Sequence, residues 1–465
     1  MIELYPHQED LVGETAMAFR EHRSVLMQAP TGSGKTVLGA CIAQRASAKG
    51  NRLMFCVHRR NLIKQTAQTM TNVGLEYGLI AAGHTPDHQQ PVQIASIDTL
   101  RNRLDRVPLP DLLVIDEAHM AAAQTWRKVV KYYREQGSRV LGLSATPSRC
   151  DGKPLSDLFD YMVQGPPVHW LMEHGYLSSY VAYAPSAPDL SGVRTTAGDY
   201  ARGELADAVD KPKLTGDAAK HYRKLAMNTR AICYCASIKH SEHVCEHFNK
   251  HGIPAVHIDG KTPRDVQAQA IRDFADGKYL VLCNVELITT GFDLSAQVGR
   301  DVPVETIIML RPTQSEALCL QMIGRGLRRK PNPAIILDHS GNLFRHGLPD
   351  QERDWTLESA KKQRAKSEDT PVPIRQCPEC YFCHPPNPTC PQCGHTYEVK
   401  SREIEYVEGE LQQIEVQRIR MKEKREQGSA RSVEDLEALG RARGYKNPRA
   451  WAYFVHQARR RKSAA

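Results

Sequence analysis

The sequence lacks any apolar run that approaches the ~18–20 residues needed to cross a bilayer. Its opening residues, MIELYPHQED, include acids and lack the apolar segment of a signal peptide. Internal repeats are also missing. These absences argue against a membrane-spanning, exported or repeat protein, and we expect a cytoplasmic location.

Compositional extremes are missing as well. Hydrophobic residues make up 41% of the chain and charged residues 25%, which is typical of a soluble globular protein and excludes a disordered or fibrous one. At 465 residues, the chain is long enough for two or three domains, each with its own buried core.

Acidic residues are absent from Ala438 to the C-terminus, where eight residues are Lys or Arg. The whole chain carries a formal net charge of +9, so the rest of it carries only 9 − 8 = +1. The positive charge therefore belongs to the C-terminal end. An end of this kind suggests an anionic polymer as a partner.

Cysteine has an uneven distribution. Of the 13 cysteines, five lie within residues 377–393 and the others are scattered. Four of the scattered ones occur in apolar, strand-like runs, and we expect buried reduced thiols at Cys56, Cys233, Cys235 and Cys283.

Short apolar runs alternate with polar, helix-like stretches through residue 340. Continuous apolar runs separated by helices indicate parallel strands covered on both faces, and hence two successive α/β domains. The predicted strands are residues 24–28, 52–57, 92–97, 111–116, 139–144, 231–236, 255–259, 279–284, 306–310 and 334–338. We predict domains at 1–165 and 166–345, a polar, helix-prone linker at 346–375, a metal module at 376–397 and a charged, helical C-terminal module at 398–465.

A glycine-rich turn lies between the first predicted strand and the helix-like stretch that follows it. Its glycines let successive backbone N–H groups face a phosphate chain, and the helix N-terminus adds partial positive charge. Lys35 would reach the β and γ phosphates, and the Thr36 hydroxyl would bind Mg²⁺. The remaining predicted nucleotide contacts are Pro30, Thr31, Gly32, Ser33 and Gly34. The general phosphate-binding pattern GxxxxGK[ST] begins with glycine, whereas this turn has Ala29 at that position.

Two adjacent carboxylates end the strand at 111–116, in the sequence Asp-Glu-Ala-His. Asp116 would hold Mg²⁺ through water, while Glu117 would orient and deprotonate the attacking water. An acidic strand exit is the alternative reading for these residues alone.

The glycine-rich turn and the Asp116–His119 motif resemble those of superfamily 2 helicases. Further motifs of that family follow in order: Ser144-Ala145-Thr146, then Thr290-Gly291-Phe292-Asp293, and the QxxGRxxR pattern of residues 321–328. The resemblance covers roughly residues 1–345 and implies two RecA-like domains that bind ATP between them. It assigns Arg325 and Arg328 as arginine fingers that reach the γ-phosphate from the second domain. It also places His119, Gln321, Gly291 and Asp293 in the ATP site.

Shorter matches to the family are less specific. Gln8 resembles the glutamine that precedes the P-loop and would pair with the adenine edge. Residues 58–62 and 95–100 resemble motifs that touch the sugar–phosphate backbone, and the predicted contacts are Arg59, Arg60, Ser96 and Thr99. A solvated basic loop is the alternative explanation for Arg59 and Arg60.

The cysteine cluster has the spacing Cys377-x2-Cys380-x9-Cys390-x2-Cys393, typical of a structural four-thiolate zinc site. Cys383 and His384 lie between the two pairs and are alternative ligands. A redox-active dithiol and unliganded thiols are the competing interpretations.

The basic end interleaves cations with aromatic residues, and the predicted nucleic-acid contacts are Arg441, Arg443, Lys446 and Arg449. A small helical hairpin with Trp451 and Phe454 in its own core is the alternative for the aromatics. The whole architecture resembles bacterial RadD-type repair helicases and phage-encoded relatives.

The resemblance implies a DNA helicase or duplex translocase that uses ATP, Mg²⁺ and Zn²⁺ in repair, replication or recombination. An RNA helicase fits the same motifs, and an ATP-gated clamp that recruits partners is a non-enzymatic alternative. Nucleic acid, DNA above all, is the expected partner, repair or replication proteins are candidates, and a monomer is favoured.

Overall fold

A computed structural model describes most of the chain. The described residues are 3–57, 60–119, 124–148, 153–184, 188–196, 198–210, 212–288, 294–358, 374–397, 430, 432–442, 448–449, 452 and 455–456. The chain forms two compact units, Met1–Tyr397 and Glu398–Ala465. No helix among the described residues has the length and apolar character to span a membrane.

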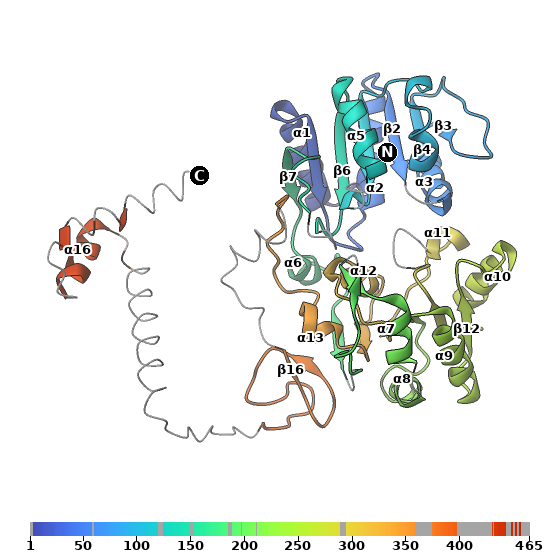
Figure 1. The fold of residues 1–465 in the computed structure, drawn as a ribbon, viewed down its shortest axis with the longest axis vertical. Helices are drawn as coiled ribbons and strands as arrows, with labels where there is room; N and C mark the ends of the chain where they lie inside the picture. The colour runs from blue at the N-terminus through green and yellow to red at the C-terminus, as the bar shows by residue number, and fades with distance from the viewer. Residues whose placement is uncertain are drawn as a thin grey trace. The chain divides into compact units, whose positions relative to one another are not determined.

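The first part of the larger unit, lobe 1 (residues 3–164), is built on a seven-stranded parallel sheet (Figure 1). The strand order is β3-β4-β2-β5-β6-β1-β7. The strands are β1 Ser24–Gln28, β2 Leu53–Val57, β3 Tyr77–Ile80, β4 Val92–Ser96, β5 Leu112–Asp116, β6 Arg139–Ser144 and β7 Tyr161–Gln164. The helices are α1 Pro6–Glu21, α2 Lys35–Ser47, α3 Arg60–Asn72, α4 Ile97–Leu100 and α5 Gln124–Glu135, with a 3₁₀ turn at Leu104–Arg106.

The second part, lobe 2 (residues 168–346), has a six-stranded parallel sheet in the order β12-β13-β11-β14-β15-β8. Its strands are β8 Tyr180–Tyr183, β11 Ala231–Tyr234, β12 Ala255–Ile258, β13 Val281–Asn284, β14 Thr306–Met309 and β15 Ala334–Asp338. Its helices are α6 Val168–Glu173, α7 Arg202–Val209, α8 Pro212–Leu225, α9 Ile238–Lys250, α10 Arg264–Ala275, α11 Leu294–Val298, α12 Glu316–Gly324 and α13 Asn342–His346. A two-stranded hairpin, β9 Thr195–Thr196 and β10 Asp199–Tyr200, precedes α7.

Each sheet separates two apolar layers. Leu141 and Val114 belong to one layer of lobe 1, and Leu113 and Phe159 belong to the other. Lobe 2 repeats this arrangement with its own two layers. Because both faces are buried, the strands read as continuous apolar runs in the sequence. The predicted fold of two tandem parallel-sheet domains is confirmed, as are all ten predicted strands and the buried free thiols.

The segments beyond the sheets differ in part from expectation. Residues 347–358 contain no helix, although a helix-prone linker was predicted there. They cross back to lobe 1, where the Leu357 carbonyl accepts hydrogen bonds from the Leu155 and Ser156 N–H groups at 2.7 and 3.0 Å. Residues 188–210 contain the β9–β10 hairpin and α7. Residues 398–429 of the predicted charged, helical module lie outside the described residues.

The metal module attaches to the edge of the second sheet. Its small strands β16 Arg375–Gln376 and β17 Cys383–His384 pair with each other. An isolated bridge joins Phe382 to Tyr183 of β8, and the Ala184 N–H donates to the Tyr381 carbonyl at 3.1 Å. In the smaller unit, helix α16 Val433–Ala442 packs Leu436 against Ala430 and Ala452.

The Phe159 side chain belongs to the lobe 1 core, and its removal should reduce the stability of the protein. It is fully buried, so Phe159→Ala should lower the free energy of unfolding by about 3–5 kcal/mol, the usual cost of removing a buried ring. Phe344→Ala is the control, because that ring is 47% exposed. Urea titrations of both variants measure the difference, and equal midpoints would contradict this account of the core.

Candidate functional site

The glycine-rich turn joins the end of β1 to the start of α2. Gly32 and Gly34 have φ values of +91° and +90°, which residues with a Cβ rarely adopt, so the turn depends on glycine here. The Ser33 hydroxyl donates to the Pro30 carbonyl at 2.7 Å and closes the curve. The turn therefore leads directly into a helix N-terminus at Lys35, the arrangement that binds phosphate.

Gln8 supports this turn from helix α1. Its side-chain N–H donates to the Ser33 carbonyl at 2.8 Å, and its side-chain oxygen accepts the Tyr5 N–H at 3.0 Å. A methyl group on Gly34 would lie 2.9 Å from the Gln8 side-chain nitrogen. Gln8 thus braces the turn in this structure, and its contact with adenine stays a prediction.

The two acids follow strand β5. Glu117 is buried and has a φ of +52°, an unfavourable value for a residue with a side chain. Its N–H donates to Asp116 Oδ1 at 3.0 Å. Burial and, secondly, the Glu117 charge raise the pKa of Asp116, while Lys35 opposes the shift. Burial lowers the pKa of Lys35 despite the two nearby acids.

This donor set fits a magnesium ion. Asp116 offers a carboxylate and Thr36 a hydroxyl, which are the hard oxygen donors that Mg²⁺ prefers. A divalent cation would also offset the cost of placing two carboxylates side by side in a buried site.

His119 joins three motifs. Its Nδ1 lies 3.2 Å from Ser144 Oγ at the end of β6 and 3.5 Å from a Glu117 carboxylate oxygen. Its Nε2 lies 3.5 Å from the side-chain nitrogen of Gln321, which belongs to α12 in lobe 2. The ring therefore links the acids of lobe 1 to the predicted arginine-finger segment.

That segment lies against the glycine-rich turn. A methyl group on Gly324 would lie 2.4 Å from Thr31 Cβ, so only glycine allows this approach. The two arginines that follow, Arg325 and Arg328, lie near enough to Lys35 for their charges to lower its pKa further. The structure thus brings together Lys35, the two acids and the two arginines from both lobes.

The other predicted residues do not belong to this cluster, and several lie outside the described residues. Ser96 is buried at the end of β4, and Thr99 is half-buried in α4. Arg441 pairs with Glu437 at 2.6 Å on α16, and Arg449 is exposed. Outside the described residues lie Arg59, Gly291, Asp293, Arg443, Lys446, Trp451 and Phe454, as well as the side chain of Arg60.

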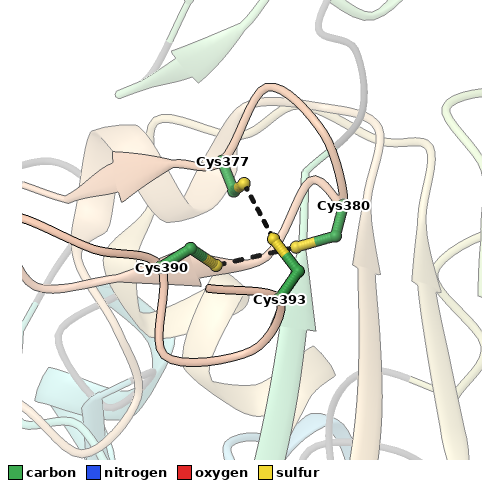
Figure 2. Close-up of side chains that lie close together, drawn as sticks. All are labelled: Cys377, Cys380, Cys390 and Cys393. Carbon is green, nitrogen blue, oxygen red and sulfur yellow. Dashed lines mark hydrogen bonds between the residues drawn. The ribbon is translucent and has the colours of Figure 1, made fainter. Parts of the chain in front are cut away.

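The four predicted zinc ligands meet at one point (Figure 2). The sulfur atoms of Cys377, Cys380, Cys390 and Cys393 all lie within 4.8 Å of one another. The Cys377–Cys393 and Cys380–Cys390 sulfur pairs are 3.5 and 3.7 Å apart. Four thiols in one small volume match the tetrahedral set that zinc prefers.

The alternative ligands point elsewhere. Cys383 packs in the lobe 2 core, with its sulfur 3.8 Å from the Tyr381 carbonyl. His384 Nε2 lies 2.6 Å from the Tyr397 hydroxyl.

Two contacts near the nucleotide site have no signal in the sequence. Leu177 lies 3.1 Å from where a methyl group on Gly32 would sit, and Gln28 donates to the Ala145 carbonyl at 3.0 Å. Both depend on segments that meet only in the folded chain. The spacing along the sequence could not reveal them.

Comparison with family models agrees with this geometry. Residues 1–149 match the model described as "Type III restriction enzyme, res subunit". Residues 216–330 match the model described as "Helicase conserved C-terminal domain". The first match contains the glycine-rich turn and both acids, and the second contains both arginines.

Similar proteins come from phages and from yeast. A "51.5 kDa protein" of a Lactococcus phage is 35% identical over 401 residues, which is 85% of this chain and 84% of that protein. IRC3 of Saccharomyces cerevisiae, whose name proposes an ATP-dependent helicase, is 26% identical over 351 residues. That match covers 70% of this chain, which spans about half (49%) of the yeast protein's length.

Solved structures share the fold. The restriction–modification enzyme LlaBIII matches with a TM-score of 0.54 at 16% identity, over 73% of this chain and 28% of that one. The helicase MrfA matches with a TM-score of 0.51 at 16% identity, over 73% of this chain and 46% of that one. Together with the site between two RecA-like lobes, these relationships show that the chain belongs to the superfamily 2 helicases.

Proposed function

We propose that the protein is an ATP-dependent DNA helicase or duplex translocase that acts in repair, replication or recombination. The observation that carries the proposal is the close packing of the lobe 2 segment that holds Arg325 and Arg328 on the lobe 1 turn that leads to Lys35. A methyl group on Gly32 would lie 3.8 Å from Arg328 Cγ. A nucleotide between these groups would bridge the lobes. It would favour the closed arrangement by its greater affinity for that state.

Different side chains of the protein would carry out different parts of ATP hydrolysis. Lys35 and the turn's N–H groups would hold the phosphates, and Glu117 would accept a proton from the attacking water. Arg325 and Arg328 would stabilise the charge that develops on the γ-phosphate. A magnesium ion held by Thr36 and Asp116 would neutralise phosphate charge. Release of the products removes the contact between the lobes and lets them separate.

DNA is the favoured nucleic-acid substrate. Two solved structures that share the fold, those of LlaBIII and MrfA, are complexes with DNA. The motifs of the ATP site occur with either DNA or RNA, so RNA is the alternative substrate. The intact acid, lysine and arginine set argues against an idle clamp.

ATP turnover with different nucleic acids tests the proposed function directly. We expect single-stranded or forked DNA to stimulate turnover more than RNA of equal length and sequence. Stimulation by RNA alone would replace the proposal with its alternative. Turnover that responds to no nucleic acid would contradict both.

The substitution Glu117→Gln tests whether Glu117 is the general base. The amide fills the same volume but cannot accept the proton of the attacking water, so ATP binding should persist while turnover falls by ~10²–10⁴-fold. Equilibrium binding of a labelled ATP analogue and steady-state turnover are the two measurements. Turnover within tenfold of the parent protein would show that Glu117 is not the base.

We also propose that the four clustered cysteines hold one structural zinc ion. Their module joins β8 at Tyr183 and places Cys383 in the lobe 2 core. Metal binding and local folding should therefore be coupled at this edge of lobe 2. The basic end beyond Gly440 would add affinity for the nucleic-acid backbone.

Elemental analysis tests the zinc site. The parent protein should carry about one zinc ion per chain, because one set of four thiolates completes one tetrahedral site. Cys393→Ser should lose most of it, because the weakened site retains three thiolates. Cys245→Ser, which removes a partly buried thiol outside the cluster, should keep the parental content. A metal-free parent protein, or an unchanged zinc content in Cys393→Ser, would contradict the assignment.

A further inference from the structure

Lobe 1 has a hollow at the edge of its sheet opposite the ATP site. It measures about 520 Å³ and lies where β1, β5 and β6 begin, whereas the glycine-rich turn and the acids follow the ends of these strands. Arg20, His22 and Arg23 line it from the end of α1, and Arg139 lines it from the start of β6. Strands of about five residues separate the two edges by roughly 15 Å.

Two guanidinium groups in this hollow have no partner among the residues that the structure describes. Arg20 and Arg139 are exposed, and the guanidinium group of neither forms a hydrogen bond or ion pair with any described residue. Three other arginines of lobe 1 are paired with acids, whereas the exposed Arg101 and Arg106 also have no side-chain partner among the described residues. The three pairs are Arg45–Glu9, Arg127–Asp157 and Arg134–Asp160, at 2.6, 2.6 and 2.8 Å. The hollow thus gathers donors that the protein itself does not use.

The third arginine is held in place. Arg23 Nη1 donates to the Gly137 carbonyl at 3.1 Å, which fixes one wall. Two carboxylates also line the hollow. Asp111 Oδ2 accepts the Arg52 N–H at 2.8 Å, and Glu21 lies within 4.0 Å of no cationic group among the described residues. Neither acid forms an ion pair with Arg20 or Arg139, and the three arginines outnumber the two carboxylates in the lining.

An aromatic pair lies beside the arginines. The His22 ring stacks on Tyr161 with centroids 4.7 Å apart and planes 5° from parallel. Tyr161 is 46% exposed, so one surface of the pair remains open to solvent. An exposed ring beside cations is the combination that nucleic-acid-binding surfaces use for bases and backbone.

We propose that this hollow is a second DNA-binding site. It binds the phosphodiester backbone of a DNA segment other than the segment that binds across the two lobes. Guanidinium groups bind phosphate oxygens in a bidentate way. The volume is that of a ligand pocket, but the arginine-rich lining suits an anion rather than an apolar molecule. The hollow lies at the opposite edge of the sheet from the ATP site. DNA bound across the two lobes would therefore reach the hollow as a bent strand or as the second arm of a junction.

The proposal rests on DNA as the protein's substrate, and its test separates the two claims. Binding of forked DNA is measured over a range of salt concentrations for the parent protein and for R20A/R139A. Each lost phosphate contact lowers the slope of log affinity against log salt by ~0.9. We expect the slope to fall by ~1–2 and the affinity to fall severalfold at low salt. Turnover at saturating DNA should stay unchanged.

A matched control removes two exposed arginines elsewhere. Arg264 and Arg272 lie on α10 of lobe 2, and R264A/R272A should keep nearly the parental slope. R20E/R139E, which reverses the charge, should weaken binding further than R20A/R139A. Parental slope and affinity in both hollow variants would overturn the second site while leaving the proposed function intact. A parent protein that binds no DNA would overturn both.

Discussion

The close contact between Gly324 and Thr31 is the constraint on which the candidate active site depends. Thr31 belongs to the glycine-rich turn of lobe 1, and Gly324 ends helix α12 of lobe 2. A side chain on Gly324 would collide with Thr31, so it would hold Arg325 and Arg328 away from Lys35. The geometry of hydrolysis therefore depends on how closely the two lobes can approach.

Two structural features outside the two sheets support this close packing of the lobes. Arg353, on the segment that crosses back to lobe 1, pairs with Glu316 at the start of α12 at 2.7 Å. It also donates to the carbonyls of His346, Leu348, Pro349 and Gln351. The predicted metal module lies against β8 at the edge of the lobe 2 sheet. The chain after the second sheet thus stabilises the lobe that supplies the arginines.

The sequence predicted the strands buried on both faces, because burial on both faces requires continuous apolar runs. Of the four edge strands of the two large sheets, it missed β3, β7 and β8, which are only partly buried, and predicted β12. Motif order predicted which residues enter the ATP site. It could not predict Leu177 against Gly32, the return of Leu357 to lobe 1 or the hollow beside Arg139, because these features arise from segments distant in sequence.

The central claim is that hydrolysis needs arginines from one lobe at a nucleotide held by the other. Arg325→Ala tests this claim most directly, with turnover and nucleotide affinity measured on the same preparation. The account predicts a fall in turnover of ~10³-fold, as for other arginine fingers, with a far smaller change in nucleotide affinity. Parental turnover in this variant would contradict a site shared between the lobes.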